Sequence, residues 1–320
     1  MAVFTPVSEG TLRALLSRFD LGELTAFEGI ASGIENTNYF VDTTQGRFVL
    51  TLFEKLSAKE LPFYLELMRH LANRGVACPR PMADRDGHLL QHCEHKPASL
   101  ATRLKGVWQP QPTARHCEIL GAAIAASHIA VADYSGHQPN LRGLSWWIDT
   151  VPQLLSHVRP DQAALLHDEL RAQRRFAETP LAQSLPRGAV HADLFRDNVL
   201  FEESPCGPVL GGFIDFYFAG VDSFVFDLAV AVNDWCIRFE TDDSGELATD
   251  RHDALLAGYT AVRPLSSAEQ QAWPMALRAA AFRFWVSRLY DWHLPRKAAM
   301  LTPKDPAHFE RLLLARRSDT

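Results

Sequence analysis

Residues 189–200 read Ala189-Val190-His191-Ala192-Asp193-Leu194-Phe195-Arg196-Asp197-Asn198-Val199-Leu200. Apolar residues stand at both ends and polar residues fill the middle, which predicts a strand, a polar loop and a second strand. The loop carries the pattern His-x-Asp-x-x-x-x-Asn, with Asp193 as its acid and Asn198 as its amide. The other segments of the chain can be placed around this loop.

A second acid follows at the end of the next predicted strand. The run 211–216 is apolar apart from Asp215, and turn-forming residues at 202–208 separate it from the strand that follows the loop. Two apolar runs joined by such a turn predict a β-hairpin. The hairpin would bring Asp193, Asn198 and Asp215 to one place.

These residue types suit phosphoryl transfer. A kinase catalytic loop has the same spacing, in which the Asp accepts the proton of the attacking hydroxyl and the Asn binds a metal ion. Magnesium prefers oxygen ligands from carboxylates and phosphates, a role open to Asn198 and Asp215. The alternative is that His-x-Asp occurs by chance and that Asp and Asn merely form turns. The joint pattern, in the right order and flanked by strands, favours phosphoryl transfer.

Composition indicates an ordinary globular protein with more than one core. The chain has 320 residues, of which 47% are hydrophobic and 22% charged, and this length predicts two lobes. A net charge of −6 without a basic block argues against a nucleic-acid partner. No signal peptide and no apolar run of bilayer length is visible, so no membrane partner is expected and a cytoplasmic location is predicted. The oligomeric state is not predicted.

The five cysteines are widely spaced and form no Cys-x-x-Cys pair. Neither a disulfide framework nor a zinc site is therefore indicated.

The first hundred residues predict a mostly β lobe with one main helix. Two β-rich segments, 28–41 and 47–53, flank a loop of small residues that includes Gly33, a geometry able to bring backbone N–H groups over phosphates. A plain β-hairpin is the alternative. A helical stripe at 58–74 and a crossing at 94–98 complete the lobe, so we predict domains at 1–97 and 98–320.

The second part of the chain is predicted to be mainly helical, with helices at 113–132, 160–178 and 275–292. Asp227 stands at the start of an apolar run, where it either caps a helix or anchors the catalytic loop. Asp222 either binds substrate or forms a turn.

Arg288 lies on the apolar stripe of the segment 275–292 and needs an anion there, because an unpaired buried charge is costly. The anion would be a substrate carboxylate, or else Asp291, unless the side chain extends outward to solvent.

With these residues in hand, the chain resembles the aminoglycoside and choline phosphotransferase superfamily, and within it the homoserine kinases of that type. The resemblance covers nearly the whole length. Its most specific parts are Gly33-Ile34-Glu35-Asn36-Thr37-Asn38-Tyr39-Phe40, the run 191–198 and Ile214-Asp215-Phe216-Tyr217-Phe218-Ala219.

The resemblance implies an α+β, protein-kinase-like bilobal fold, with a small β-rich N-lobe and a larger, mainly helical C-lobe. It implies ATP and Mg²⁺ as cofactors and phosphorylation of the L-homoserine hydroxyl on the way to threonine. Asp193 would be the base, and Asn198 with Asp215 the metal ligands. The other roles implied are nucleotide binding for Gly33, Asn36 and Lys55, substrate binding for Arg288 and Asp222, and support of the loop for His191 and Asp227.

One position departs from the superfamily pattern. The Lys or Arg that most members carry on the strand 48–53 to grip the phosphates aligns with Thr51, and Lys55 is the nearest substitute. The metal motif also reads Asp215-Phe216-Tyr217 in place of Asp-Phe-Gly, which leaves the ligand but removes the basis for an activation switch.

Two other functions stay open at this point. One is a kinase of the same fold acting on hydroxylysine, methylthioribose or an aminoglycoside, and the other is a non-catalytic nucleotide-binding protein. An amino-acid substrate calls for a cation facing its carboxylate, whereas a polycationic aminoglycoside calls for an acidic cleft. Retention of Asp193, Asn198 and Asp215 argues against the non-catalytic alternative.

Overall fold

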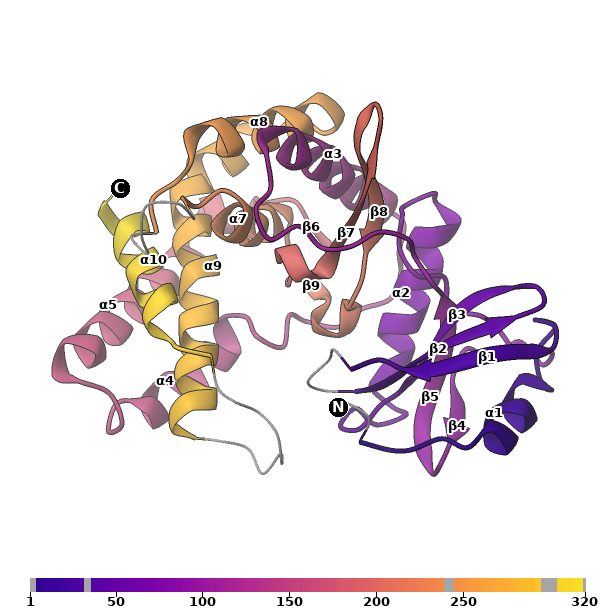
Figure 1. The fold of residues 1–320 in the computed structure, drawn as a ribbon. Coiled ribbons are helices and arrows are strands. Elements are labelled where there is room, and N and C mark those ends of the chain that lie inside the picture. The colour runs from indigo at the N-terminus through magenta and orange to yellow at the C-terminus, as the bar shows by residue number, and fades with distance from the viewer. Residues whose placement is uncertain (1–3, 32–35, 239–244, 295–303, 319–320) are drawn as a thin grey trace. The chain divides into compact units, whose positions relative to one another are not determined.

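A computed structural model describes residues 4–31, 36–238, 245–294 and 304–318. Two compact units divide the chain, Met1–Lys105 with Gly211–Ile214, and Gly106–Leu210 with Asp215–Thr320. The fold class predicted from the sequence is confirmed, since the first unit is built on a β-sheet and the second is mainly helical (Figure 1).

The first unit contains a five-stranded antiparallel sheet in the order β1-β2-β3-β5-β4. Its strands are β1 (Leu24–Gly29), β2 (Thr37–Thr43), β3 (Gly46–Leu52), β4 (Gln91–Cys93) and β5 (Lys96–Thr102), and its helices are α1 (Glu9–Leu16) and α2 (Leu61–Asn73). Alternate residues of β3, namely Phe48, Leu50 and Leu52, enter the apolar core beneath α1. This period of two is what a sheet with one buried face requires.

The prediction that the chain passes from the first lobe to the second at residues 94–98 is wrong. These residues form the turn between β4 and β5 and the start of β5, which pairs with β3 in the first unit. Glu94 and His95 both have positive φ in this turn. Polar residues of this kind occur in turns and in linkers alike, so the sequence alone did not distinguish the two. The domain division at residues 97 and 98 stays a prediction, whereas the first compact unit continues through Lys105.

Helices make up most of the second unit. They are α3 (Ala114–Ala130), α4 (Leu144–Leu154), α5 (Pro160–Ala177), α6 (Pro180–Gln183), α7 (Phe224–Trp235), α8 (Thr249–Val262), α9 (Ser267–His293) and α10 (Ala307–Ser318). Two short strands, β6 (Arg187–Val190) and β9 (Gly220–Ser223), pair antiparallel, and β7 (Val199–Ser204) pairs with β8 (Gly207–Phe213) as the predicted hairpin.

Two glycines let α3 and α8 pack at very short range (Figure 1). A Cβ at Gly121 would overlap the carbonyl oxygen of Leu255, and a Cβ at Gly258 would overlap the carbonyl oxygen of Glu118. Each helix therefore presents its glycine to the backbone of the other.

All five cysteines lie in the described part of the chain, and none is in a disulfide. The exposed one is Cys206, in the turn between β7 and β8; Cys78, Cys93, Cys117 and Cys236 are buried. Burial raises the pKa of the Cys78 thiol to about 12 and that of the Cys93 thiol to about 11.

No helix within the described ranges combines the length and the hydropathy that crossing a membrane requires.

Candidate active site

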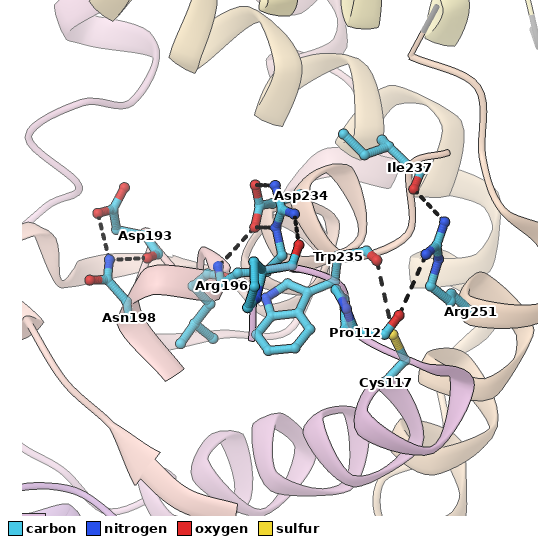
Figure 2. A network of polar contacts seen from close by, with 11 residues as sticks. Pro112, Cys117, Asp193, Arg196, Asn198, Asp234, Trp235, Ile237 and Arg251 are labelled. Carbon is cyan, nitrogen blue, oxygen red and sulfur yellow. Dashed lines mark hydrogen bonds and ion pairs between the residues drawn. The ribbon is translucent and has the colours of Figure 1, made fainter. Parts of the chain in front are cut away.

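The loop between β6 and β7 carries Asp193 and Asn198, as predicted. A 3-10 turn, η1 (Arg196–Asn198), ends the loop and directs Asn198 back toward the acid. Asn198 Nδ2 donates to Asp193 Oδ2 at 3.0 Å and to the Asp193 backbone oxygen at 2.7 Å (Figure 2). The amide therefore fixes the orientation of the carboxylate.

The environment of Asp193 disfavours its charge. Burial raises the pKa of this carboxyl to about 7, and the nearby negative charges of Asp215 and Asp197 act in the same direction. Arg283 opposes them and lowers the pKa, with its Nη2 atom 3.8 Å from Asp193 Oδ1. A carboxylate whose pKa lies near neutrality can accept a proton from an alcohol.

Asp215 follows β8 directly and has left-handed backbone angles, φ 62° and ψ 63°. Such angles are strained for a residue with a side chain, and strain of this kind is often retained at functional sites. The turn η2 (Phe216–Phe218) comes next, and its Phe216 packs on His191 with ring centroids 4.6 Å apart. Since Asp215 acts on the charge of Asp193, the second unit brings the two acids into one electrostatic environment.

The donor set fits a hard divalent cation. Asn198 uses its amide nitrogen on Asp193, so its oxygen is the atom that remains to face a cation, and Asp215 adds a carboxylate. Amide and carboxylate oxygens are ligands that Mg²⁺ accepts.

Both ends of α7 hold the catalytic loop. At its N-terminal end Asp227 Oδ1 accepts a hydrogen bond of 2.7 Å from the Ala192 backbone N–H, and Ala192 has a positive φ of 61°. At its C-terminal end Trp235 Nε1 donates to the Leu194 carbonyl at 3.0 Å. Backbone groups on either side of Asp193 are thus tied to one helix.

Asp234 binds the loop through Arg196. Its Oδ2 accepts from Arg196 Nε at 3.0 Å and from the Arg196 backbone N–H at 2.8 Å, as Figure 2 shows. Asp234 Oδ1 accepts a third hydrogen bond from Arg196 Nη2 at 3.3 Å, so Asp234 stabilises the loop in this structure.

A buried chain of polar groups extends from Asp227. Its Oδ2 lies 3.0 Å from His128 Nε2, and His128 Nδ1 lies 2.8 Å from the Tyr259 hydroxyl. His128 lies on α3 and Tyr259 on α8, so these two helices support the hydrogen bond between α7 and the loop.

The predicted substrate residues occupy two different settings. Asp222 accepts hydrogen bonds from Asn140 Nδ2 and from the Ser223 backbone N–H, and pairs with Arg187 at 3.4 Å. Arg288 is half-buried on α9; burial lowers its pKa, which Asp193 raises in turn. Arg288 thus acts on the charge of Asp193, whereas the contacts of Asp222 are with Asn140, Ser223 and Arg187.

The predicted nucleotide residues belong to the first unit. Gly33 lies outside the described residues, and Asn36 precedes β2, where its carbonyl accepts a hydrogen bond from Asn38 Nδ2 at 3.4 Å. Thr51 is buried on β3 and donates to Asn38 Oδ1 at 2.7 Å, whereas Lys55 is exposed just after that strand. Their contacts with a nucleotide remain predictions.

Sequence reasoning missed Arg283. It lies in the run Phe282-Arg283-Phe284-Trp285, every residue of which is buried, and burial lowers the pKa of its guanidinium to about 10. A charged residue within such an apolar run was the available signal.

Comparisons with known proteins identify the family of this chain. The model of the phosphotransferase enzyme family matches residues 26–265. The homoserine kinase of Polaromonas naphthalenivorans is 52% identical over 99% of this chain and 98% of that protein, and the homoserine kinase of Burkholderia mallei is 51% identical over 99% and 96%.

Solved structures show the same fold at low sequence identity. An amicoumacin kinase in complex with AMP-PNP and Ca²⁺ has a TM-score of 0.70 at 16% identity, covering 98% of this chain and 94% of that one. A choline kinase from Cryptosporidium parvum has a TM-score of 0.66 at 12% identity, covering 98% and 96%. The chain therefore belongs to the phosphotransferase enzyme family and, within it, to the homoserine kinases.

Proposed function

We propose that this chain transfers the γ-phosphoryl group of ATP to the side-chain hydroxyl of L-homoserine, giving O-phospho-L-homoserine for threonine synthesis. Homoserine kinases about half identical over nearly the full chain support the substrate. The observation in the structure that carries the proposal is the pair of hydrogen bonds by which Asn198 orients Asp193.

Asp193 acts as the general base in this proposal. Its carboxylate takes the proton of the homoserine hydroxyl as the oxygen attacks the γ-phosphorus, and ADP leaves with the electron pair of the broken bond. Phosphoryl transfer depends on positioning and on charge stabilisation more than on covalent chemistry, so a loop held by Asp227 and Trp235 serves the reaction directly.

Asn198 and Asp215 would hold Mg²⁺, which supplies positive charge to the phosphate oxygens. We choose Mg²⁺ because the donor set consists of oxygens. Gly33, Asn36 and Lys55 are the proposed nucleotide contacts, and His191 and Asp227 the proposed supports of the loop. Since the reaction uses ATP, the cytoplasm is the compartment we propose for it.

A substrate panel tests this function. The purified protein is incubated with ATP and Mg²⁺ and with L-homoserine, hydroxylysine, methylthioribose or an aminoglycoside, and ADP release is measured for each. We expect kcat/KM for L-homoserine to exceed the others by at least about 100-fold. Preference for another compound, or ATP binding without transfer to any of them, would contradict the proposal.

A further inference from the structure

Arg283 is a cation buried beside the catalytic acid. It lies on α9, is 4% exposed, and has buried Phe282 and Phe284 as its neighbours in the sequence. Burying a guanidinium is costly unless an anion and hydrogen-bond acceptors compensate the lost water. A buried Arg in this position therefore requires an anionic partner.

Asp193 compensates Arg283 only in part. The 3.8 Å between Arg283 Nη2 and Asp193 Oδ1 is an ion pair but exceeds hydrogen-bond length. Arg283 Nε is fully buried and donates to no residue in the described ranges. The Nε–H group of Arg283 is therefore a donor without an acceptor among the described residues.

Two aromatic rings lie close to the guanidinium of Arg283. Its Cζ atom lies 3.8 Å from the centroid of the Phe284 ring and 5.3 Å from that of Phe218, which ends the turn after Asp215. Aromatic rings interact favourably with a guanidinium, and a carboxylate binds such a group through two N–H donors in its plane.

Two half-buried arginines of the second unit are paired with carboxylates at hydrogen-bond distance. Arg278 donates to Glu169 through Nε at 3.2 Å and through Nη2 at 2.6 Å, and Arg263 donates to Glu269 at 2.9 Å. Arg283 instead has two further cations nearby, since Arg142 and Arg288 both lower its pKa. Two carboxylates, Asp193 and Asp291, raise the pKa of Arg283 in turn.

We propose that the edge of the Arg283 guanidinium binds the carboxylate of the amino-acid substrate and makes the site selective for it. This inference rests on the proposed function. In homoserine a four-carbon chain carries the carboxylate at one end and the hydroxyl at the other. A molecule of this size can engage Arg283 and Asp193 at once, which places the hydroxyl at the base.

A role in positioning Asp193 alone is the competing explanation, and a pair of substrates separates the two. The compound 3-aminopropan-1-ol keeps the hydroxyl and the ammonium of homoserine and the three carbons that join them, and lacks the carboxylate. Loss of a carboxylate contact affects homoserine alone, whereas a disturbed base slows both substrates equally.

The experiment compares wild type, Arg283→Lys and Arg283→Met at saturating ATP and Mg²⁺, with kcat/KM measured for both substrates. Wild type should prefer L-homoserine by about 100-fold or more. In Arg283→Met that preference should fall to less than about fivefold, because only L-homoserine loses a carboxylate contact, whereas the lost ion pair with Asp193 slows both substrates by the same factor. Where turnover of the amino alcohol is too slow to measure, its inhibition constant against homoserine replaces kcat/KM.

Matched variants control for the loss of any arginine. Arg288→Met makes the same change five residues along α9, and Arg171→Met makes it on an exposed side chain that pairs with Asp168 on α5. Arg171→Met should keep the full preference. Collapse of the preference in Arg288→Met with retention in Arg283→Met would overturn the assignment in favour of Arg288.

The remaining outcomes are also decisive. Equal losses for both substrates in a folded Arg283 variant, judged by its melting curve, would assign Arg283 to positioning and overturn the proposal. If Arg283→Met fails to fold, Arg283→Lys keeps the charge and should still lose homoserine selectivity, because an ammonium cannot bind a carboxylate through two fixed donors. If the wild type phosphorylates homoserine without preferring it to 3-aminopropan-1-ol, only this inference is wrong. If the wild type does not phosphorylate homoserine, the proposed function is wrong.

Discussion

Asp193 has an environment that makes its carboxylate both basic and rigid. Burial raises its pKa to about 7, and the two hydrogen bonds from Asn198 hold it in one orientation. A group that must accept a proton near neutral pH benefits from both properties.

Replacing Asp193 by Ala is expected to lower kcat by at least about 1000-fold, because Asp193 is the proposed acceptor of the hydroxyl proton. The affinity for ATP should change little, since the proposed nucleotide contacts are on other residues. Steady-state kinetics and ATP titration by calorimetry measure the two quantities. Turnover near the wild-type rate would exclude Asp193 as the base.

The pH dependence of kcat/KM should follow the ionisation of Asp193. Its pKa is raised from the ordinary value to about 7, so the protonated, inactive form accumulates as the pH falls below 7. We expect kcat/KM to decline about tenfold per pH unit on the acid side and to be level above about pH 8. Initial rates across this interval test the expectation, and a profile that stays flat down to about pH 5 would contradict it.

Local patterns predicted some residues of the site and not others. Asp193 and Asn198 are separated by one short loop, so their spacing in the sequence specifies their contact. Arg283 was missed because α9 is buried around much of its circumference, and helical periodicity then does not distinguish one face from another. Helical periodicity instead indicated Arg288. Its predicted contact with substrate is tested by the kinetic comparison of Arg288→Met with Arg283→Met.

Among the elements, α7 connects the loop to the rest of the second unit. Its two ends form hydrogen bonds with the backbone of Ala192 and of Leu194. The bond to Ala192 is supported by His128 of α3 and Tyr259 of α8. The sequence indicated that Asp227 either capped a helix or anchored the loop. It lies in the first turn of α7 and bonds to the loop, so the two alternatives coexist.

The close packing of α3 and α8 gives a prediction for this element pair. Gly258→Ala would place a methyl group against the Glu118 carbonyl, and the helices would have to separate. We expect a loss of about 3 kcal/mol in the free energy of unfolding, measured by urea denaturation.

Gly10→Ala is the control for that change. Gly10 lies in α1 with room for a methyl group, so the same substitution should be neutral or stabilise by up to about 1 kcal/mol. Equal stabilities of the two variants would show that α3 and α8 accommodate the methyl group.

For the whole molecule, the sequence indicated two lobes because its length exceeds one core and because strand and helix patterns separate along the chain. The structure has two compact units of those two kinds. The passage between them was misplaced because a β-turn and a linker share the same polar residues. Contacts of β5 with β3, which join distant parts of the sequence, decide such a question.

Ligand binding should stabilise the whole protein through linkage. At a MgATP concentration about 100 times its Kd, the free energy of unfolding should increase by about 2.7 kcal/mol, with a matching rise in Tm. Excess EDTA should remove most of this shift and abolish phosphoryl transfer, and Lys55→Met should reduce the shift if Lys55 contacts the phosphates. Differential scanning fluorimetry measures each case, and an EDTA-insensitive enzyme would contradict the proposed metal site.

The distribution of the cysteines offers a practical route to following this enzyme at work. Cys206 is exposed at the tip of the β7–β8 hairpin, whereas the other four sulfurs are shielded inside the protein. A maleimide dye should therefore attach at one position without any engineered mutation. That fluorophore would sit on the hairpin whose second strand leads into Asp215, so its emission can report nucleotide arrival in real time.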